Sequence, residues 1–170
     1  MADKPLQLVS GRSVQVELLV SSAGAGDSGK GVAVDATGRL DTSFMPVGIG
    51  ADTKSVITSE NLAAGDMVNI YDNASTANAR KADATAEGKE CHGFVLAATT
   101  SPAEAIVFFE GVNTQLSGLT VGARQYLDAA TPGGTVETAL SATGNVHQLV
   151  GVAISATEMS FEAAETITIA

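Results

Sequence analysis

Residues 24–31 carry the most specific chemical pattern in this sequence. The segment Gly24-Ala-Gly-Asp-Ser-Gly29-Lys30-Gly31 matches G-x-x-x-x-G-K, the start of a phosphate-binding loop. Such a loop needs Ser or Thr after the lysine to hold Mg²⁺, and then a helix whose N-terminus faces the phosphate. Here Gly31 follows the lysine, and the next residues are poor helix formers. We therefore interpret residues 24–31 as a flexible loop with a solvated lysine, and we predict no cofactor.

Two histidines, His92 and His147, are candidate metal ligands. Each precedes a central strand of one half of the chain, so an internal repeat would bring them to related positions. A zinc or copper site needs at least one further well-placed ligand. Cys91 adjoins His92, but neighbouring residues on a strand point to opposite faces. We predict surface or subunit-interface histidines rather than a metal site.

Groups for nucleophilic or acid–base catalysis are sparse. No G-x-S-x-G elbow is present, and we expect the Cys91 thiol to be half-buried rather than reactive. Glu104 and Glu110 straddle a predicted strand and are candidates for a hydrolase pair. An aromatic platform for a sugar is missing, however, because Trp is absent and Tyr occurs only twice.

Three aspartates in Gly-rich loops are candidate Ca²⁺ ligands: Asp35, Asp41 and Asp52. Their spacing differs from that of the twelve-residue calcium-binding loop. We therefore expect them to be solvated turn residues. Together with the sparse catalytic groups, this predicts a protein that is not an enzyme and holds no metal.

The composition argues against further classes of function. A net charge of −10, from 19 acidic and 9 basic residues, opposes binding to nucleic acid or to an anionic membrane. No run of about 18 apolar residues is present, so we expect no membrane span. The first residues lack the apolar stretch of a signal peptide, and the single Cys91 suits a reducing compartment. We therefore expect synthesis in a cytoplasm.

The elements that would position any site are β-strands in two similar units. Short apolar runs rich in β-branched or aromatic residues alternate with turn formers, which is typical of strands. Features of residues 62–111 recur in order later in the chain. Gly65 and Gly122 are 57 positions apart, Gly93 and Gly151 are 58 apart, and Phe109 and Phe161 are 52 apart. We predict a mainly β fold, a compact β-sandwich or barrel built from two similar β units, with an extended N-terminal arm.

Residues 1–50 are the predicted arm. A loose start over 1–10 precedes a strand over 13–21, the Gly-rich loop and an extended connector over 39–50. The connector mixes apolar residues with Pro and Gly and has neither a helical nor a strand period. Its apolar side chains would form an adhesive patch if all of them faced water. We predict that they bind a partner subunit, and the partner-binding residues are Leu40, Phe44, Met45, Pro46, Val47 and Ile49.

Residues 51–170 are the predicted duplicated domain. Its units span about 56–112 and 116–163, and an edge strand covers 165–170. The helical signal is weak and amounts to one turn over 59–64. The core must come from small aliphatic residues, each of which buries little area, and from only five Phe. We therefore expect modest intrinsic stability and assembly into a homodimer or homotrimer.

Several segments resemble structural proteins of tailed bacteriophages, among them His92-Gly93-Phe94-Val95. The resemblance covers about 36–162 and is carried by residues 36–50, 62–68, 80–82, 92–95, 118–123, 126–127, 131–134 and 144–153. Similar modules are common in phage head decoration proteins and in some tail fibres. The resemblance implies a capsid decoration (cement) protein that binds the outer surface of the capsid where major capsid subunits meet. Its partners would be the major capsid protein and itself, on a virion assembled in the host cytoplasm.

A tail fibre or receptor-binding accessory module of the virion is the alternative. Fibres usually show long repeats or a trimeric stalk, whereas this chain has two β units. A polysaccharide-binding or sugar-processing domain is disfavoured by the lack of aromatic residues. The copy number in purified particles distinguishes these classes, because decoration requires hundreds of copies.

Overall fold

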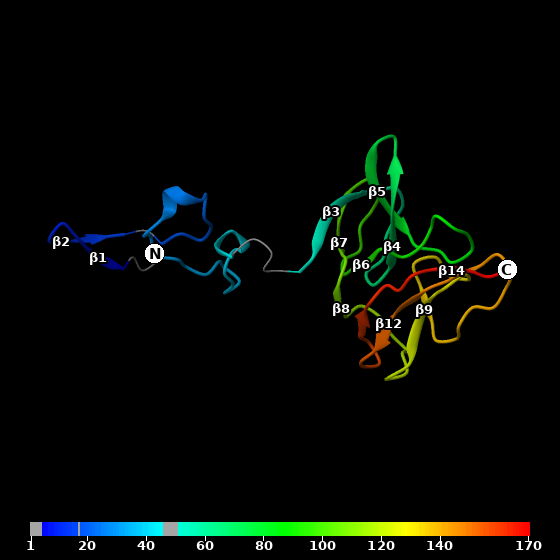
Figure 1. Cartoon of the computed structure of the whole chain (residues 1–170). Helices are drawn as coiled ribbons and strands as arrows, with labels where there is room; N and C mark the ends of the chain where they lie inside the picture. Colours follow the sequence, from blue (N-terminus) through cyan, green and yellow to red (C-terminus); the bar gives the residue numbers. More distant parts are fainter. Residues whose placement is uncertain (1–4, 17, 46–50) are drawn as a thin grey trace. The chain divides into compact units, whose positions relative to one another are not determined.

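Strands make up almost all of the regular structure in this chain, as its sequence patterns predict (Figure 1). The computed structural model describes residues 5–16, 18–45 and 51–170. The chain divides into two compact units, Met1–Gly50 and Ala51–Ala170, which we name unit 1 and unit 2. The fold is mainly β and contains a closed five-stranded barrel. The extended N-terminal arm stays a prediction.

Unit 1 begins with a hairpin. Strands β1 (Leu6–Val9) and β2 (Arg12–Gln15) pair antiparallel. Ser10 and Gly11 join them with φ angles of 51° and 80°, and a two-residue turn with two positive φ angles suits the twist of a hairpin. Residues 6–9 of the predicted loose start instead form β1, because the tight turn lets them pair with β2. The predicted strand over 13–21 is confirmed over 13–15, where β2 ends.

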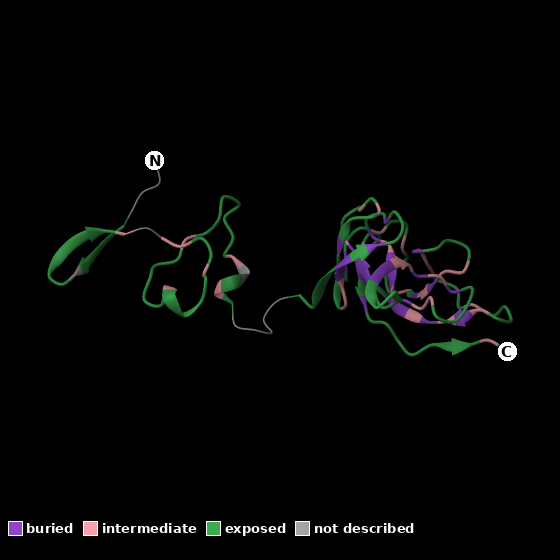
Figure 2. Cartoon of the chain, turned by 90° about the horizontal axis from the view of Figure 1, so that it is seen from above, coloured by how far each residue is buried: buried purple, intermediate pink, exposed green. Residues whose placement is uncertain are grey.

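The rest of the described part of unit 1 is loop with two 3₁₀ helices, η1 (Ala25–Asp27) and η2 (Thr42–Phe44). Leu19 and Val32 form an isolated parallel bridge. No described residue of this unit is buried, as the green and pink ribbon of its described segments shows (Figure 2). Local hydrogen bonds, rather than an apolar core, therefore hold its described part together.

The first half of unit 2 is the closed barrel. Its strands are β3 (Thr53–Thr58), β4 (Met67–Asn73), β5 (Thr76–Lys81), β6 (Gly93–Val95) and β7 (Glu104–Phe108). Hydrogen bonds follow the order β3-β5-β4-β6-β7, and the parallel pairing of β3 with β5 closes the ring. Alternate apolar side chains fill its interior, among them Val56, Val68, Val95 and Val107. Closure removes the edges that an open sheet would expose.

The second half of unit 2 repeats this strand order in an open sheet. Its strands are β8 (Gly111–Asn113), β9 (Arg124–Leu127), β10 (Thr135–Val136), β12 (Leu149–Ala153) and β13 (Met159–Phe161). Their order, β10-β9-β12-β13-β8, is that of the barrel when β8, β9, β10, β12 and β13 replace β3, β4, β5, β6 and β7. Within residues 51–170, no pairing of β8 with β10 closes this sheet. Strands β11 (Val146–His147) and β14 (Ile167–Thr168) form a separate pair.

Two glycines mark the duplication. A Cβ added at Gly93 would lie 2.5 Å from the carbonyl oxygen of Phe108 on the neighbouring strand. A Cβ added at Gly151 would lie 2.3 Å from the carbonyl oxygen of Ser160. Because Phe108 and Ser160 are 52 positions apart, as the sequence repeat requires, the same close strand approach occurs in both halves. The prediction of two similar β units is confirmed.

A second core joins the two halves of unit 2 (Figure 2). Phe94, on the outer side of the barrel, packs against Met159 and Phe161 of the open sheet, and all three are buried. The ring centroids of Phe94 and Phe161 are 5.2 Å apart, and those of Phe94 and Phe108 are 5.4 Å apart. Each half therefore buries apolar side chains of the other.

The helical turn predicted over 59–64 is wrong. Leu62 and Thr99 form an isolated antiparallel bridge, in which each N–H donates to the other carbonyl at 2.9 Å. The bridge thus pairs backbone N–H and carbonyl groups that would hydrogen-bond along the chain in a helix. Both described helical segments are three residues long, and neither has the length or apolar character to cross a bilayer.

Candidate interaction surfaces

The Gly-rich loop over 24–31 is organised around a carboxylate. Asp27 accepts hydrogen bonds from the Lys30 ammonium at 2.6 Å and from the Ala23 N–H at 2.7 Å, and these bonds lower its pKa. The lysine is therefore paired within the loop. With three residues, η1 is too short to present a helix N-terminus to a phosphate. Sequence reasoning missed the role of Asp27, although its spacing of three residues from Lys30 was visible.

The two histidines lie in different environments. His92 Nδ1 accepts a hydrogen bond from the Ile70 N–H at 3.0 Å, whereas the His147 and Tyr126 ring centroids are 4.8 Å apart. The strand register makes Val150 the counterpart of His92, so the predicted relation between the histidines is wrong. Among the residues that the structure describes, no three His, Cys, Asp or Glu side chains are arranged to hold a metal ion.

Cys91 is buried rather than half-buried. Burial raises the pKa of its thiol to about 12, so the nucleophilic thiolate is scarce at neutral pH. The Gln148 side chain holds the Cys91 backbone from both sides: Oε1 accepts from the Cys91 N–H at 2.7 Å, and Nε2 donates to the Cys91 carbonyl at 2.9 Å. This amide clamp ties the barrel to the open sheet and is structural.

Two of the candidate calcium ligands anchor turns. Asp35 Oδ1 accepts from the N–H groups of Arg39 and Thr37 at 3.0 and 2.8 Å, and Asp41 Oδ1 accepts from the Ser43 N–H at 2.9 Å. These hydrogen bonds lower the pKa of both carboxyls. Both aspartates therefore do what the turn pattern predicts. The third candidate, Asp52, accepts the Phe109 N–H at its main-chain carbonyl.

Glu104 begins β7, and Glu110 lies in a bend two residues beyond the end of that strand. The extended chain from Glu104 to Phe108 alone spans about 13 Å, whereas the carboxyl groups of glycosidases lie about 5–10 Å apart. Glu104 Oε2 accepts a hydrogen bond from Ser55 Oγ at 2.7 Å across the β3–β7 pair. The spacing does not suit a pair of cooperating carboxylates.

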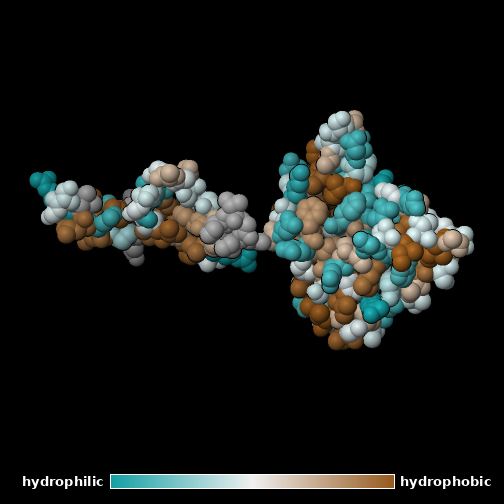
Figure 3. Space-filling view, in the orientation of Figure 1, coloured by the Kyte–Doolittle hydropathy of each residue, from teal (hydrophilic) through white to brown (hydrophobic). Residues whose placement is uncertain are grey.

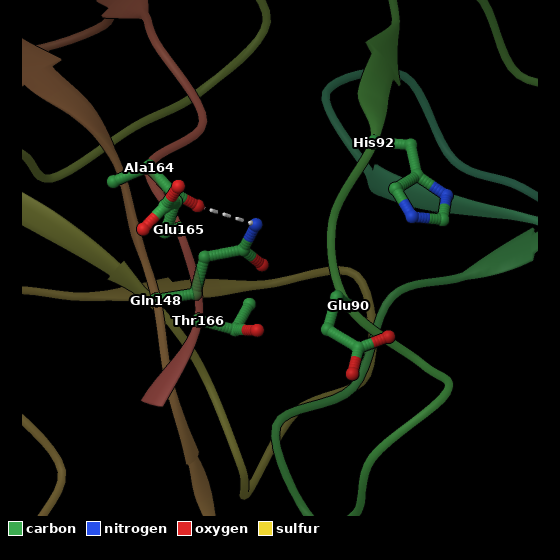
Figure 4. Close-up of a pocket in the computed structure, with 6 residues that line it drawn as sticks. All are labelled: Glu90, His92, Gln148, Ala164, Glu165 and Thr166. Atoms are coloured by element: carbon green, nitrogen blue, oxygen red, sulfur yellow. Dashed lines mark hydrogen bonds between the residues drawn. The ribbon is translucent and has the colours of Figure 1, made fainter. Parts of the chain in front are cut away.

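A cavity of about 440 Å³ lies between the two halves of unit 2 (Figure 4). Figure 4 shows Glu90 and His92 on one wall and Gln148, Ala164, Glu165 and Thr166 on the other. Gln148 Nε2 donates to the Ala164 carbonyl at 3.3 Å, and Glu90 Oε1 accepts from the Gly88 N–H at 2.9 Å. Two of its polar side chains, Glu90 and Gln148, thus hold backbone groups of the fold.

Unit 1 exposes several large apolar side chains. Leu6 and Leu8 on β1 are 74% and 71% exposed. Of the predicted partner-binding residues, Leu40 and Met45 are exposed and Phe44 is half-buried. Pro46, Val47 and Ile49 lie outside the described residues. Further exposed apolar side chains of this unit are Val14, Val20, Val32 and Val34.

Charge divides unevenly between the units. Residues 1–50 hold 5 acidic and 4 basic residues, a net charge of −1. Residues 51–170 hold 14 acidic and 5 basic residues, a net charge of −9. Unit 1 is therefore nearly neutral, whereas unit 2 carries almost all of the net charge.

Unit 2 also presents apolar side chains on the outer faces of its sheets. Ile57 and Ile106 are exposed on the barrel, and Val112, Val152 and Ile154 are exposed on the open sheet. In Figure 3, brown side chains gather on the lower part of unit 2, where Figure 1 shows β8 and β12. Sequence reasoning missed these surfaces. Alternation within each strand separates two faces but does not tell which of them a neighbouring sheet covers.

No known protein family, curated protein or solved structure matches this chain. The surfaces described above and the sequence resemblance over 36–162 are therefore the basis for proposing a function.

Proposed function

We propose that this chain is a structural virion protein that binds the outer surface of a tailed-bacteriophage capsid and cements neighbouring major capsid subunits. The observation that carries the proposal is unit 1, where no described residue is buried while several large apolar side chains face solvent. An isolated hairpin is marginally stable at best, and a large apolar patch marks an interaction site. The capsid as the target rests on the sequence resemblance over 36–162.

Docking of unit 1 would supply the energy of attachment. Burying the side chains of Leu6, Leu8, Leu40 and Met45 contributes about 1.5–3 kcal/mol each before the entropy of docking is subtracted. Repeated at many sites of a shell, contacts of this size stiffen an assembly without any chemistry. A net charge of −9 on unit 2 keeps that domain solvated, which suits a domain that stands out from a surface.

Binding to capsids tests the proposal. Undecorated capsids, assembled from the major capsid protein of the same genome, are mixed with the full chain and sedimented, and their rupture temperature is measured. We expect saturable binding and rupture at a higher temperature. The variant Leu6→Ser, Leu8→Ser, Leu40→Ser, Met45→Ser should bind weakly, and Ile167→Ser, an equally exposed apolar site on β14, should bind normally.

Two results contradict the proposal. The chain fails to bind capsids, or the fourfold variant binds and protects them as well as the parent does. The copy number in virions distinguishes the alternative, because a handful of copies indicates a tail fibre or receptor-binding module.

A further inference from the structure

A row of side chains on the outer side of the barrel is partly covered by the open sheet of the same chain. Strand pairing aligns Met67 with Phe94, Phe94 with Phe108, and Phe108 with Thr53. These four side chains form a row across β4, β6, β7 and β3. Met67 and Phe94 are completely buried, because the open sheet of the same chain lies over them, with Phe161 against Phe94.

The duplication places a matching row on the open sheet. Pairing aligns Arg124 with Val152, Val152 with Ser160, and Ser160 with Val112, so each residue occupies the position of its barrel counterpart. This second row is uncovered. Val152 and Val112 are 39% and 41% exposed, and Ile154, two residues beyond Val152 on the same face, is 48% exposed. Both halves of unit 2 therefore carry the same row, which is covered on the barrel and exposed on the open sheet.

Arg124 indicates the chemistry of the missing cover. It is the only lysine or arginine among residues 91–170, which hold seven acidic residues. It is exposed and forms no ion pair with any residue that the structure describes. A partner that covers this row must therefore bring apolar side chains together with a carboxylate.

The barrel of the same protein carries such a surface. Ile57 and Ile106 are 41% and 58% exposed on adjacent strands, and Glu104 lies directly opposite Ile57. Ser55 Oγ donates to Glu104 Oε2, which leaves Oε1 available for a partner. Beside them lies an open groove of about 330 Å³, lined by Leu96, Ala97, Thr99, Glu104, Ile106 and Phe108.

We propose that the uncovered row of one copy binds the Ile57–Glu104–Ile106 face of a second copy, with Arg124 paired to Glu104 of that copy. The contact is head-to-tail, because it joins two different faces. Such contacts form a closed ring when the rotation between copies closes, and an open chain when it does not. The proposal uses unit 2 alone and does not rest on the proposed capsid function.

Charge reversal tests this pairing. The mass of the full chain is measured by sedimentation equilibrium over a wide concentration range. We expect self-association, and we expect Arg124→Glu or Glu104→Arg alone to raise its apparent dissociation constant at least about tenfold. The double variant Arg124→Glu, Glu104→Arg should restore most of the affinity. Glu110→Arg, a charge reversal of an exposed residue outside this face, should change it little.

A neutral substitution keeps the proposal testable if charge reversal disturbs the fold. Val152→Ser changes an outward-facing side chain and should weaken association while the circular dichroism spectrum stays unchanged. Ile167→Ser, exposed at 64%, is its control. A parent chain that stays monomeric at every concentration overturns the proposal, as does a double variant no better than the single ones. A monomer that still binds capsids would overturn this inference and leave the capsid function standing.

Discussion

Unit 1 and unit 2 maintain their structures by different means. Unit 2 buries two apolar clusters, one inside the barrel and one between the barrel and the open sheet. In unit 1 no described residue is buried, and aspartate side chains such as Asp27 and Asp35 hold the turns. The comparison teaches that unit 2 carries its stability in its own buried clusters, whereas the described part of unit 1 leaves its large apolar side chains exposed or half-buried.

Truncation of an apolar side chain should give the largest effect, because it should destabilise unit 2 strongly and unit 1 hardly at all. Phe94→Ala removes a buried ring that touches both halves of unit 2, and we expect the free energy of unfolding to fall by about 4 kcal/mol. Leu8→Ala removes an exposed side chain of unit 1 and should change the free energy of unfolding by less than about 0.5 kcal/mol. Urea denaturation measures both variants. A large loss for Leu8→Ala would show that unit 1 has a core.

Glycine substitutions should repeat this contrast with a smaller effect. Gly151→Ala forces a Cβ to within 2.3 Å of the Ser160 carbonyl oxygen, and we expect the free energy of unfolding to fall by about 3 kcal/mol. Gly26→Ala in unit 1 meets no atom within 4 Å and should be nearly neutral. Thermal unfolding followed by circular dichroism compares the two. Equal melting temperatures for Gly151→Ala and the parent would contradict the close strand approach.

Loss of the amide clamp should cost less again. Gln148→Leu leaves the buried Cys91 N–H and carbonyl without their side-chain partner, and we expect a loss of about 2 kcal/mol. Gln15→Leu, on the exposed β2 of unit 1, is the matched control. If both variants unfold at the same urea concentration as the parent, the clamp does not stabilise the junction between the halves.

The smallest expected effect is a dependence on acid that is larger in unit 1 than in unit 2. Hydrogen bonds hold the pKa values of Asp27, Asp35 and Asp41 below the ordinary value of 3.8. Hydrogen bonds also lower the pKa values of Glu137 and, against the opposing effect of burial, of Asp83 in unit 2, but two buried clusters maintain that fold. A lowered folded-state pKa stabilises the fold above pH 3.8, and this stabilisation is lost as pH falls through the folded-state values. We expect amide signals of unit 1 to lose dispersion in that range while those of unit 2 persist. Simultaneous loss in both units would contradict the comparison.

Much of unit 2 could be predicted from sequence, and the reason is geometric. Gly93 and Gly151 each lie where a neighbouring strand leaves no room for a side chain, so their spacing in the sequence indicates the repeat. The closure of one half and not the other could not be predicted. It depends on the pairing of Ile57 with Asn78, residues whose types do not reveal a parallel neighbour.

The candidate surfaces were only partly visible in the sequence. The exposed Leu40 and Met45 were predicted from a segment with no periodicity, and whether they bind a partner stays a prediction. Leu6 and Leu8 were missed because four residues of alternation without a marked turn do not distinguish a strand from a loose start. The uncovered row on the open sheet, Arg124, Val152, Ser160 and Val112, was missed because the sequence does not reveal the strand register that aligns these residues. Nor does it reveal that the matching row on the barrel is covered while this one is exposed.

Hydrogen–deuterium exchange of the full chain, free and bound to capsids, tests the central claim most directly. We expect residues 51–170 to be protected in both states, because their strands enclose buried cores. Residues 5–45 should exchange rapidly in the free chain and become protected on the capsid. Protection of residues 5–45 already in the free chain, or protection on binding that appears only in residues 51–170, would contradict the account.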